Sequence, residues 1–432
     1  MHFRPEVNQA EFPRLFQQFI EITGHAVWDK RFKWLEQQQQ QNAFIRGYLD
    51  NIYAIELALD QLVRKIKATG TFNTHITDAS TYRLFAFVTA TAMIYQRLGN
   101  KGKNRLRGKL LGGLRDKDGL TPFEQEISVA VHLLARGFDV SFTDLEGDAR
   151  FDFLATRETV ELEVECKRVG HDLGRKIPRH EVYQLHNLIH KEVAPIFPQL
   201  SCGLFLKVIL PSRLTARHEQ QNRIAALVGR ALRTGVGIED EELCKVLVSD
   251  FAIEDSPFMQ GEPGQPQFFE SVRAFATTRF SSRNRELFIM GVPKKRAIVI
   301  SIESAESDAV LDRLFDELST SAKNQFTKDR PGLLCVQFIG LTNEQVKRLG
   351  TANDDGPKQP SALLVKTSKF LADERRSHIH TIAYRGYGNV AYSSSVTGTV
   401  ATSETQEQGA AYVISNDNHP FAKDRRYFVF SK

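Results

Sequence analysis

A strand-like segment of alternating apolar and charged residues carries the side chains best suited to chemistry. Residues 160–167 read VELEVECK. Because successive side chains of a β-strand point to opposite faces, the charged residues of this segment share one face. They are Glu161, Glu163, Glu165 and Lys167. Three carboxylates beside an ammonium group could bind a hard divalent cation and stabilise a developing negative charge, unless the segment is an ordinary strand with a solvated outer face.

The surrounding segments predict an α/β sheet covered by helices. Apolar residues recur at helical spacing over residues 123–136, and apolar segments at 138–142, 150–155 and 160–169 predict three consecutive strands. Further helices and strands alternate between residues 179 and 384. Since both faces of such a sheet are normally covered, the charged face of residues 160–167 should line an enclosed site.

In this order of elements the chain resembles the PD-(D/E)xK nuclease superfamily, which has the restriction-endonuclease-like fold. The resemblance spans residues 122–189. The matching residues are Glu126 on a helix, Asp152 at the start of a strand, Glu165 and Lys167 on the next strand, and Gln184 on a later helix. Phe151 stands where the family name has proline, a substitution that the superfamily tolerates.

The resemblance implies a role for each of these residues. Asp152, Glu165 and Glu126 would bind Mg²⁺, with Mn²⁺ as a substitute; Lys167 would be the catalytic lysine, and Gln184 a further site residue. Hard carboxylate oxygens hold Mg²⁺ while leaving positions for water and phosphate, and the ion lowers the pKa of a bound water. The implied protein is an endonuclease that hydrolyses DNA phosphodiester bonds, with RNA as an open alternative.

Several alternatives stay open around this site. Glu124 rivals Glu126 as the helix glutamate, and either could instead stabilise the helix N-terminus through the helix dipole. Glu163 points to the same side as Glu165, and we expect it to be a surface charge rather than a further ligand. The same fold could also serve as a catalytically inactive nucleic-acid-binding module.

Two basic segments are candidates for phosphate contact. Residues 100–117 carry six Lys or Arg before any acid, among interspersed glycines, and predict a flexible joint that is either an ordinary linker or a strap along a nucleic-acid backbone. Residues 171–180, which begin with His171, predict a basic loop beside the metal site. The net charge of +5 is compatible with a polyanionic partner.

Three other motifs are weaker. Gly108-Lys109 lacks the preceding glycine of a P-loop. His186 and His190 have the spacing of zinc hydrolases, but Asn187 replaces the glutamate that follows the first histidine, so we disfavour zinc catalysis. Cys166 falls on the apolar face of its strand and is expected to be a core residue.

The length of 432 residues predicts more than one domain. We predict an all-helical domain over residues 1–118 that ends in the basic joint, a nuclease core over 119–253, and a C-terminal α/β segment over 269–432 that is a second lobe or an extension of the first sheet. This architecture is similar to that of restriction or antiphage-defence effectors.

The location and partners are also expectations. Four widely spaced cysteines, an N-terminus without an apolar signal core and the lack of a membrane-length apolar segment predict a cytoplasmic protein with no membrane partner. A homo-oligomer or a defence-system partner protein is compatible with the sequence, which identifies no dimer face.

Overall fold

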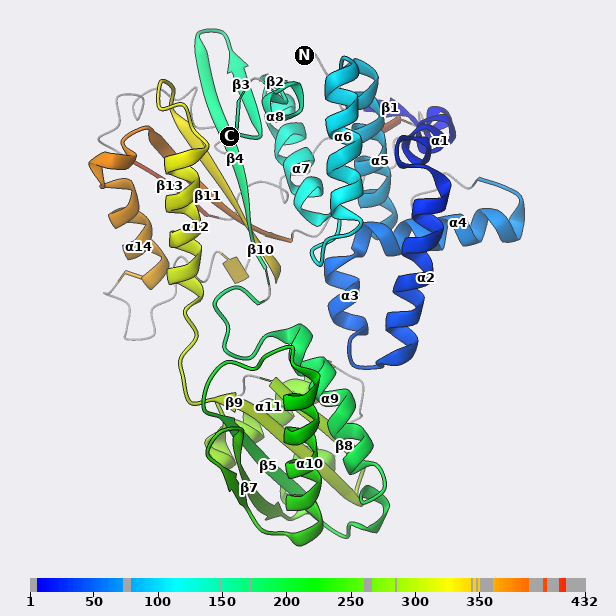
Figure 1. Cartoon of the computed structure of the whole chain (residues 1–432), viewed down its shortest axis with the longest axis vertical. Helices are drawn as coiled ribbons and strands as arrows, with labels where there is room; N and C mark the ends of the chain where they lie inside the picture. Colours follow the sequence, from blue (N-terminus) through cyan, green and yellow to red (C-terminus); the bar gives the residue numbers. More distant parts are fainter. Residues whose placement is uncertain are drawn as a thin grey trace. The chain divides into compact units, whose positions relative to one another are not determined.

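The computed structural model divides into two compact units, neither of which is continuous in sequence (Figure 1). It describes residues 6–72, 79–147, 149–170, 172–259, 266–283, 286–342, 345–346, 349, 360–387, 399–401 and 412–416. The first unit holds Met1–Gln37, Leu49–Gly170 and Leu311–Lys432; the second holds Gln38–Tyr48 and His171–Val310. The predicted boundaries at residues 118 and 253 do not coincide with these units.

Helices form most of the described N-terminal region. They are α1 (Phe12–Thr23), α2 (His25–Gln41), α3 (Arg46–Ile52), α4 (Ala54–Thr69), α5 (Ala79–Arg97), α6 (Asn100–Gly113) and α7 (Thr121–Ala135). A short strand, β1 (Glu6–Asn8), precedes them and pairs with β12 (Thr399–Ala401). Among the described residues, no helix has both the length and the apolar character needed to cross a lipid bilayer.

Helix α6 corrects the prediction of a flexible joint. Its leucines Leu106 and Leu110 recur at helical spacing and are fully buried in the core of the first unit. Gly102 lies where an added Cβ would come within 2.9 Å of the Leu98 side chain, so the glycine permits close packing there. Burial of the leucines outweighs the cost of a glycine in a helix, which is about 1 kcal/mol.

A six-stranded sheet is the centre of the first unit, with the strand order β13-β11-β10-β4-β3-β2. The strands are β2 (Asp139–Ser141), β3 (Phe153–Arg157), β4 (Val160–Val169), β10 (Gly332–Thr342), β11 (Ile379–Tyr387) and β13 (Tyr412–Ser415). Strands β2, β3 and β4 pair antiparallel, while β4, β10 and β11 are parallel. Strands β10, β11 and β13, which fall within the predicted C-terminal segment 269–432, therefore belong to this sheet.

Helices α12 (Val310–Asn324) and α14 (Ala362–Leu371) precede β10 and β11, as parallel pairing requires of crossover connections. Helix α7 shares one apolar core with the sheet, in which Ile127 lies in the same cluster as Val164 and Cys335. The short helix α8 (Thr143–Glu146) follows β2. The sheet is thus built from two distant parts of the sequence, residues 139–169 and residues 332–415.

The second unit contains a five-stranded sheet with the order β6-β7-β5-β9-β8. Its strands are β5 (Gly203–Leu210), β6 (Ile238–Asp240), β7 (Cys244–Phe251), β8 (Glu286–Val292) and β9 (Arg296–Ser304). Its helices are α9 (Arg179–Val193), α10 (His218–Thr234) and α11 (Pro266–Phe280). Single-turn 3₁₀ helices occur at Gln9–Glu11, Phe197–Gln199, Ile253–Asp255, Pro257–Met259 and Glu374–Arg376.

Both faces of β9 are covered. Ile298, Ile300 and Ile302 belong to the core that contains α9 and α10, whereas Ala297 and Val299 belong to the core that contains α11. Burial on both faces explains why this strand reads as a continuous apolar segment rather than an alternating one. Two mixed sheets flanked by helices confirm the predicted mixed α/β class.

Candidate metal centre

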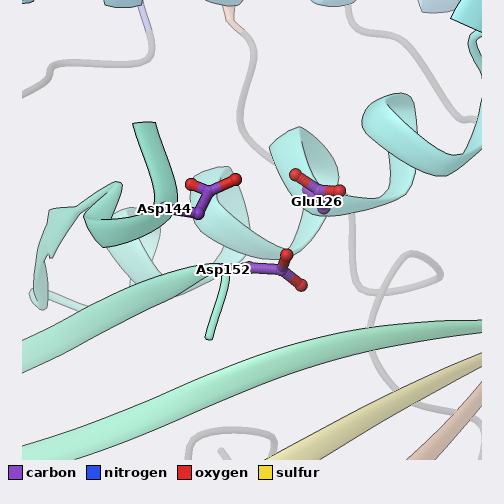
Figure 2. A group of neighbouring side chains, drawn as sticks. All are labelled: Glu126, Asp144 and Asp152. Atoms are coloured by element: carbon purple, nitrogen blue, oxygen red, sulfur yellow. The ribbon is translucent and has the colours of Figure 1, made fainter. Parts of the chain in front are cut away.

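Three carboxylates from separate elements of the first unit converge (Figure 2). Glu126 comes from α7, Asp144 from α8, and Asp152 from the residue directly before β3. One oxygen of each lies within 4.8 Å of the others. Glu126 is buried and the two aspartates are half-buried. Hard oxygen donors at this spacing are the ligand type that Mg²⁺ and Mn²⁺ prefer.

Local hydrogen bonds fix the two aspartates. The Thr143 hydroxyl donates to the carbonyl oxygen of Phe151 at 3.0 Å, which ties the start of α8 to the entry of β3. The backbone N–H of Cys166 donates to Asp152 Oδ2 at 2.7 Å, which ties Asp152 to β4. These two bonds hold Asp144 and Asp152 on neighbouring elements.

Gln125 holds the helix that presents Glu126. Its buried side-chain amide donates to the carbonyl oxygens of Lys167 on β4 and Cys335 on β10, each at 3.0 Å. These two bonds bridge parallel strands that come from distant parts of the sequence. They fix α7 against the sheet, and therefore fix Glu126 relative to Asp152.

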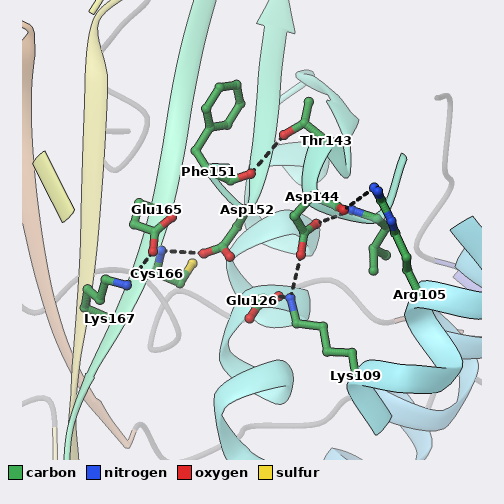
Figure 3. Close-up of polar contacts among 11 residues, drawn as sticks. Arg105, Lys109, Glu126, Thr143, Asp144, Phe151, Asp152, Glu165, Cys166 and Lys167 are labelled. Atoms are coloured by element: carbon green, nitrogen blue, oxygen red, sulfur yellow. Dashed lines mark hydrogen bonds and ion pairs between the residues drawn. The ribbon is translucent and has the colours of Figure 1, made fainter. Parts of the chain in front are cut away.

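Glu165 and Lys167 form an ion pair on β4, next to this cluster (Figure 3). The Lys167 Nζ lies 2.6 Å from Glu165 Oε1. Glu165 is only 2% exposed, and its second oxygen, Oε2, has no hydrogen-bond partner among the described residues. Glu165 lies outside the group of three carboxylates within 4.8 Å. Burial raises its pKa to about 8, and the negative charge of Asp152 contributes to the rise.

Lys109 brings a second ammonium group to the cluster from α6. Its Nζ lies 2.8 Å from Asp144 Oδ2 and also donates to Glu126 Oε2. Although burial alone would lower the pKa of Lys109, the charges of Glu126 and Asp144 raise it. When all are ionised, the four carboxylates carry two more charges than Lys109 and Lys167 neutralise, an excess that one divalent cation would balance.

Burial also opposes ionisation of Glu126 and Asp152. It raises the pKa of Glu126 well above its ordinary value, and the nearby Asp152 adds to this effect. It raises the pKa of Asp152 as well, against the opposing effects of Lys109 and the Cys166 N–H. A group of acids that is costly to ionise without a cation is an expected property of a metal site.

The structure brings Glu126 and Asp152 together and places Glu165 and Lys167 beside them. Among the carboxylates, Asp144 is the one that the sequence analysis did not predict, because it lies in the segment between two predicted strands. The only available signal was an acid between two short strands, and such acids are common in turns. Gln184 lies on α9 in the second unit. Its role in the site stays a prediction.

Glu124 and Glu163, the two alternative glutamates, both have partners within the fold. Glu124 forms a two-point ion pair with Arg83, with Nε–Oε1 and Nη2–Oε2 distances of 2.8 and 2.7 Å. The prediction that Glu163 is a surface charge is wrong, because its side chain is fully buried. It accepts hydrogen bonds from the Thr327 N–H at 2.9 Å, from the Thr327 hydroxyl, and from Arg330 at 3.5 Å. Glu163 therefore fastens the segment before β10 to β4.

The remaining candidates have ordinary environments. His186 is buried among aromatic rings, with its centroid 5.6 Å from that of Phe288, and burial lowers its pKa to about 3. Cys166 packs against the apolar core as predicted, and burial raises the pKa of its thiol. In the predicted basic loop, Lys176 is paired with Glu306, and His171 lies outside the described residues.

No protein-family model, curated protein or solved structure matches the chain.

Proposed function

We propose that the chain is a metal-dependent endonuclease that hydrolyses DNA phosphodiester bonds at the Glu126, Asp144 and Asp152 cluster. The observation that carries the proposal is the convergence of these carboxylates beside the Glu165–Lys167 pair. The order of elements supports a restriction-endonuclease-like fold: α7, the antiparallel strands β2–β4, and then α12 leading to β10, which is parallel to β4.

The residues fit a divalent cation such as Mg²⁺ or Mn²⁺. All the donors are carboxylate oxygens, and the buried Glu165 Oε2 lacks a hydrogen-bond partner within the described part of the chain. A buried acceptor without a partner costs about 1–3 kcal/mol, which a bound cation or its water would offset. Glu126, Asp144 and Asp152 would hold the ion, with Glu165 adjacent.

The chain's own groups have distinct parts in the chemistry. When bound, the cation would supply an activated water and neutralise charge on the phosphate. Lys167, held against Glu165, would orient that water or stabilise the negative charge that develops on the phosphate. Asp152 is kept in position by the Cys166 N–H, and Glu126 by the bonds of Gln125. Because the buried acids have raised pKa values, ion binding should release protons.

A plasmid nicking assay tests the proposal. Wild-type protein should nick supercoiled DNA with Mg²⁺ or Mn²⁺ and not with EDTA. Asp152→Asn removes a ligand charge at nearly constant size and should lower the rate at least about 100-fold. The matched control is Glu124→Gln, which alters a carboxylate of the same helix that pairs with Arg83, and it should cut normally. Equal cutting by wild type and Asp152→Asn would reject the proposed site.

A second candidate function is a catalytically inactive nucleic-acid-binding module. Lys109 favours it, because its ammonium group already contacts two of the three clustered carboxylates and could replace a metal ion. This function predicts DNA retention without nicking under any metal, and no binding of Mn²⁺ by calorimetry. If the protein cuts DNA, we propose that it is a restriction or antiphage-defence effector, in which the helical region and the second unit add to the nuclease core.

A further inference from the structure

Helix α6 carries positive charge and no negative charge. Its sequence, NKGKNRLRGKLLGG, contains five Lys or Arg and no acid. The buried leucines Leu106 and Leu110 face the core of the first unit. Lys101, Arg105 and Arg107 are exposed, and Lys109 is three-quarters covered. Such a helix presents an uncompensated basic surface on the side that does not pack.

One face of α6 leads to the metal centre. Residues four apart lie on the same face of a helix, so Lys101, Arg105 and Lys109 form a line, which we call the α6 stripe. Lys109 reaches Asp144 and Glu126, and Arg105 Nη1 donates to the main-chain oxygen of Asp144 at 3.1 Å. Figure 3 shows both side chains extending from α6 toward Asp144.

Arg105 is held in place without being neutralised. Its guanidinium lies against Gly147, where an added Cβ would come within 1.8 Å of Nη1. Gly147 also has a φ of +85°, so two independent requirements favour glycine at this position. Arg105 forms no ion pair with an acid of the described chain. A guanidinium has five N–H donors, and a single hydrogen bond to a carbonyl leaves most of them for a ligand.

We propose that the α6 stripe binds the phosphate backbone of DNA beside the metal centre, with Arg105 as its central contact. This inference rests on the proposed function, because it assumes that the acid cluster acts on a phosphodiester. The positive charge of the stripe favours a polyanion such as DNA as its ligand. The acid cluster repels a polyanion, so a substrate strand needs adjacent fixed cations, and a guanidinium matches phosphate oxygens in a two-point geometry.

The dimensions of the stripe suit a strand of DNA. Lys109 is eight positions after Lys101 on the helix, which corresponds to a rise of about 12 Å. One strand of duplex DNA presents a phosphate about every 3.4 Å along its axis, so the stripe spans about three phosphates. Lys109, at the inner end of the stripe, is already paired with Asp144 and Glu126. Arg105 and Lys101 therefore supply the contacts to the phosphates beyond the reacting one.

A comparison of Arg105→Ala with Arg107→Ala tests this proposal in the full-length protein. Both arginines are exposed, both lie on α6, and each substitution removes one charge, but Arg107 lies outside the stripe. Binding to a short duplex is measured in EDTA at several salt concentrations. Arg105→Ala should weaken binding about tenfold and lower the slope of log K against log salt by about 1, the value for one lost phosphate contact. Arg107→Ala should leave the slope unchanged.

Further measurements separate the alternatives. Arg105→Lys should keep the slope, because the charge is retained, and circular dichroism should be unchanged in all three variants. Equal effects of Arg105→Ala and Arg107→Ala would overturn the proposal that the α6 stripe binds DNA. Binding of a poly-glutamate peptide in place of DNA would also overturn it. If the slopes differ as expected but no metal supports nicking, the proposed function fails while the stripe stands. If nicking occurs and the slopes are equal, the stripe alone fails.

Discussion

Two buried glutamates, one in each unit, have the same burial and different sets of polar partners. Glu165 lies on β4 inside the six-stranded sheet, and Glu303 lies on β9 inside the five-stranded sheet. Each is 2% exposed. Both strands have a neighbour on either side, so neither residue is at a sheet edge. Residue type, burial and position in the sheet therefore do not distinguish the two.

The difference lies in their partners. Glu303 Oε1 accepts hydrogen bonds from the Ser301 hydroxyl at 2.8 Å and the Arg283 N–H at 3.1 Å, and Oε2 lies 3.6 Å from Lys207 Nζ. Glu165 has Lys167 on one oxygen and, among the described residues, no hydrogen-bond partner on the other. Both oxygens of Glu303 therefore have a partner, through hydrogen bonds to Oε1 and an ion pair to Oε2, whereas the free Oε2 of Glu165 could accept a cation or its water.

The strongest test of this comparison is the pair Glu165→Gln and Glu303→Gln. We expect Glu165→Gln to lower the nicking rate at least about 100-fold, because it removes a charge that the proposed metal centre and Lys167 require. Glu303→Gln should keep the specific activity of wild type. Its cost should be stability, about 1–3 kcal/mol, because an amide NH₂ must face donors that the carboxylate accepted.

Thermal unfolding in EDTA completes this test. Glu303→Gln should unfold at a lower temperature than wild type, while Glu165→Gln should not, because it removes a poorly solvated carboxylate. The comparison breaks if both variants lose activity equally, or if Glu165→Gln destabilises the metal-free protein as much as Glu303→Gln does.

The pH dependence of stability should report on Glu165. Burial raises the pKa of Glu165 from 4.5 to about 8 in the folded protein. Between these values the folded state keeps a proton that the unfolded state has lost, so stability should fall as pH rises from about 5 to about 8. The loss should be of the order of a few kcal/mol, read as a falling unfolding temperature in EDTA.

One variant and a metal titration check the assignment of this slope. Glu165→Gln should make the pH dependence shallower without abolishing it, because burial also raises the pKa of Glu126 and of Asp152. Saturating Mn²⁺ should also flatten it, because the ion favours the ionised carboxylates at high pH. An unchanged slope in Glu165→Gln would show that Glu165 does not contribute to the pH dependence.

The site residues that could be predicted from the sequence lie on helices and strands that follow one another along the chain. The two-residue period of one strand places Glu165 and Lys167 on a shared face, and the resemblance to a nuclease superfamily implied Asp152 and Glu126. Asp144 and Lys109 could not be found this way. Lys109 reaches the acids only because α6 packs against α7 and α8, and its glycines suggested a joint instead of a helix.

The fold was predictable to the same extent. Alternating helices and strands predicted the mixed α/β class. The same alternation occurs whether the strands form one sheet or two, so it does not predict the number of sheets. Strand β4 pairs with β10, and the intervening His171–Val310 builds a separate sheet. Strand pairing depends on hydrogen bonds and apolar contacts between residues that are distant in sequence. The local spacing of apolar residues therefore does not predict it.

Glu163 offers the finest test, because it lies two residues from Glu165 on the same strand and is also fully buried. Thr327 and Arg330 satisfy its oxygens, so it should behave like Glu303. Glu163→Gln should cost about 1–3 kcal/mol of stability and leave specific activity intact. Glu161→Gln, at the exposed end of the strand, should change stability by less than about 1 kcal/mol. Loss of activity in Glu163→Gln without loss of stability would mean that position along β4, and not the set of partners, decides which glutamate is functional.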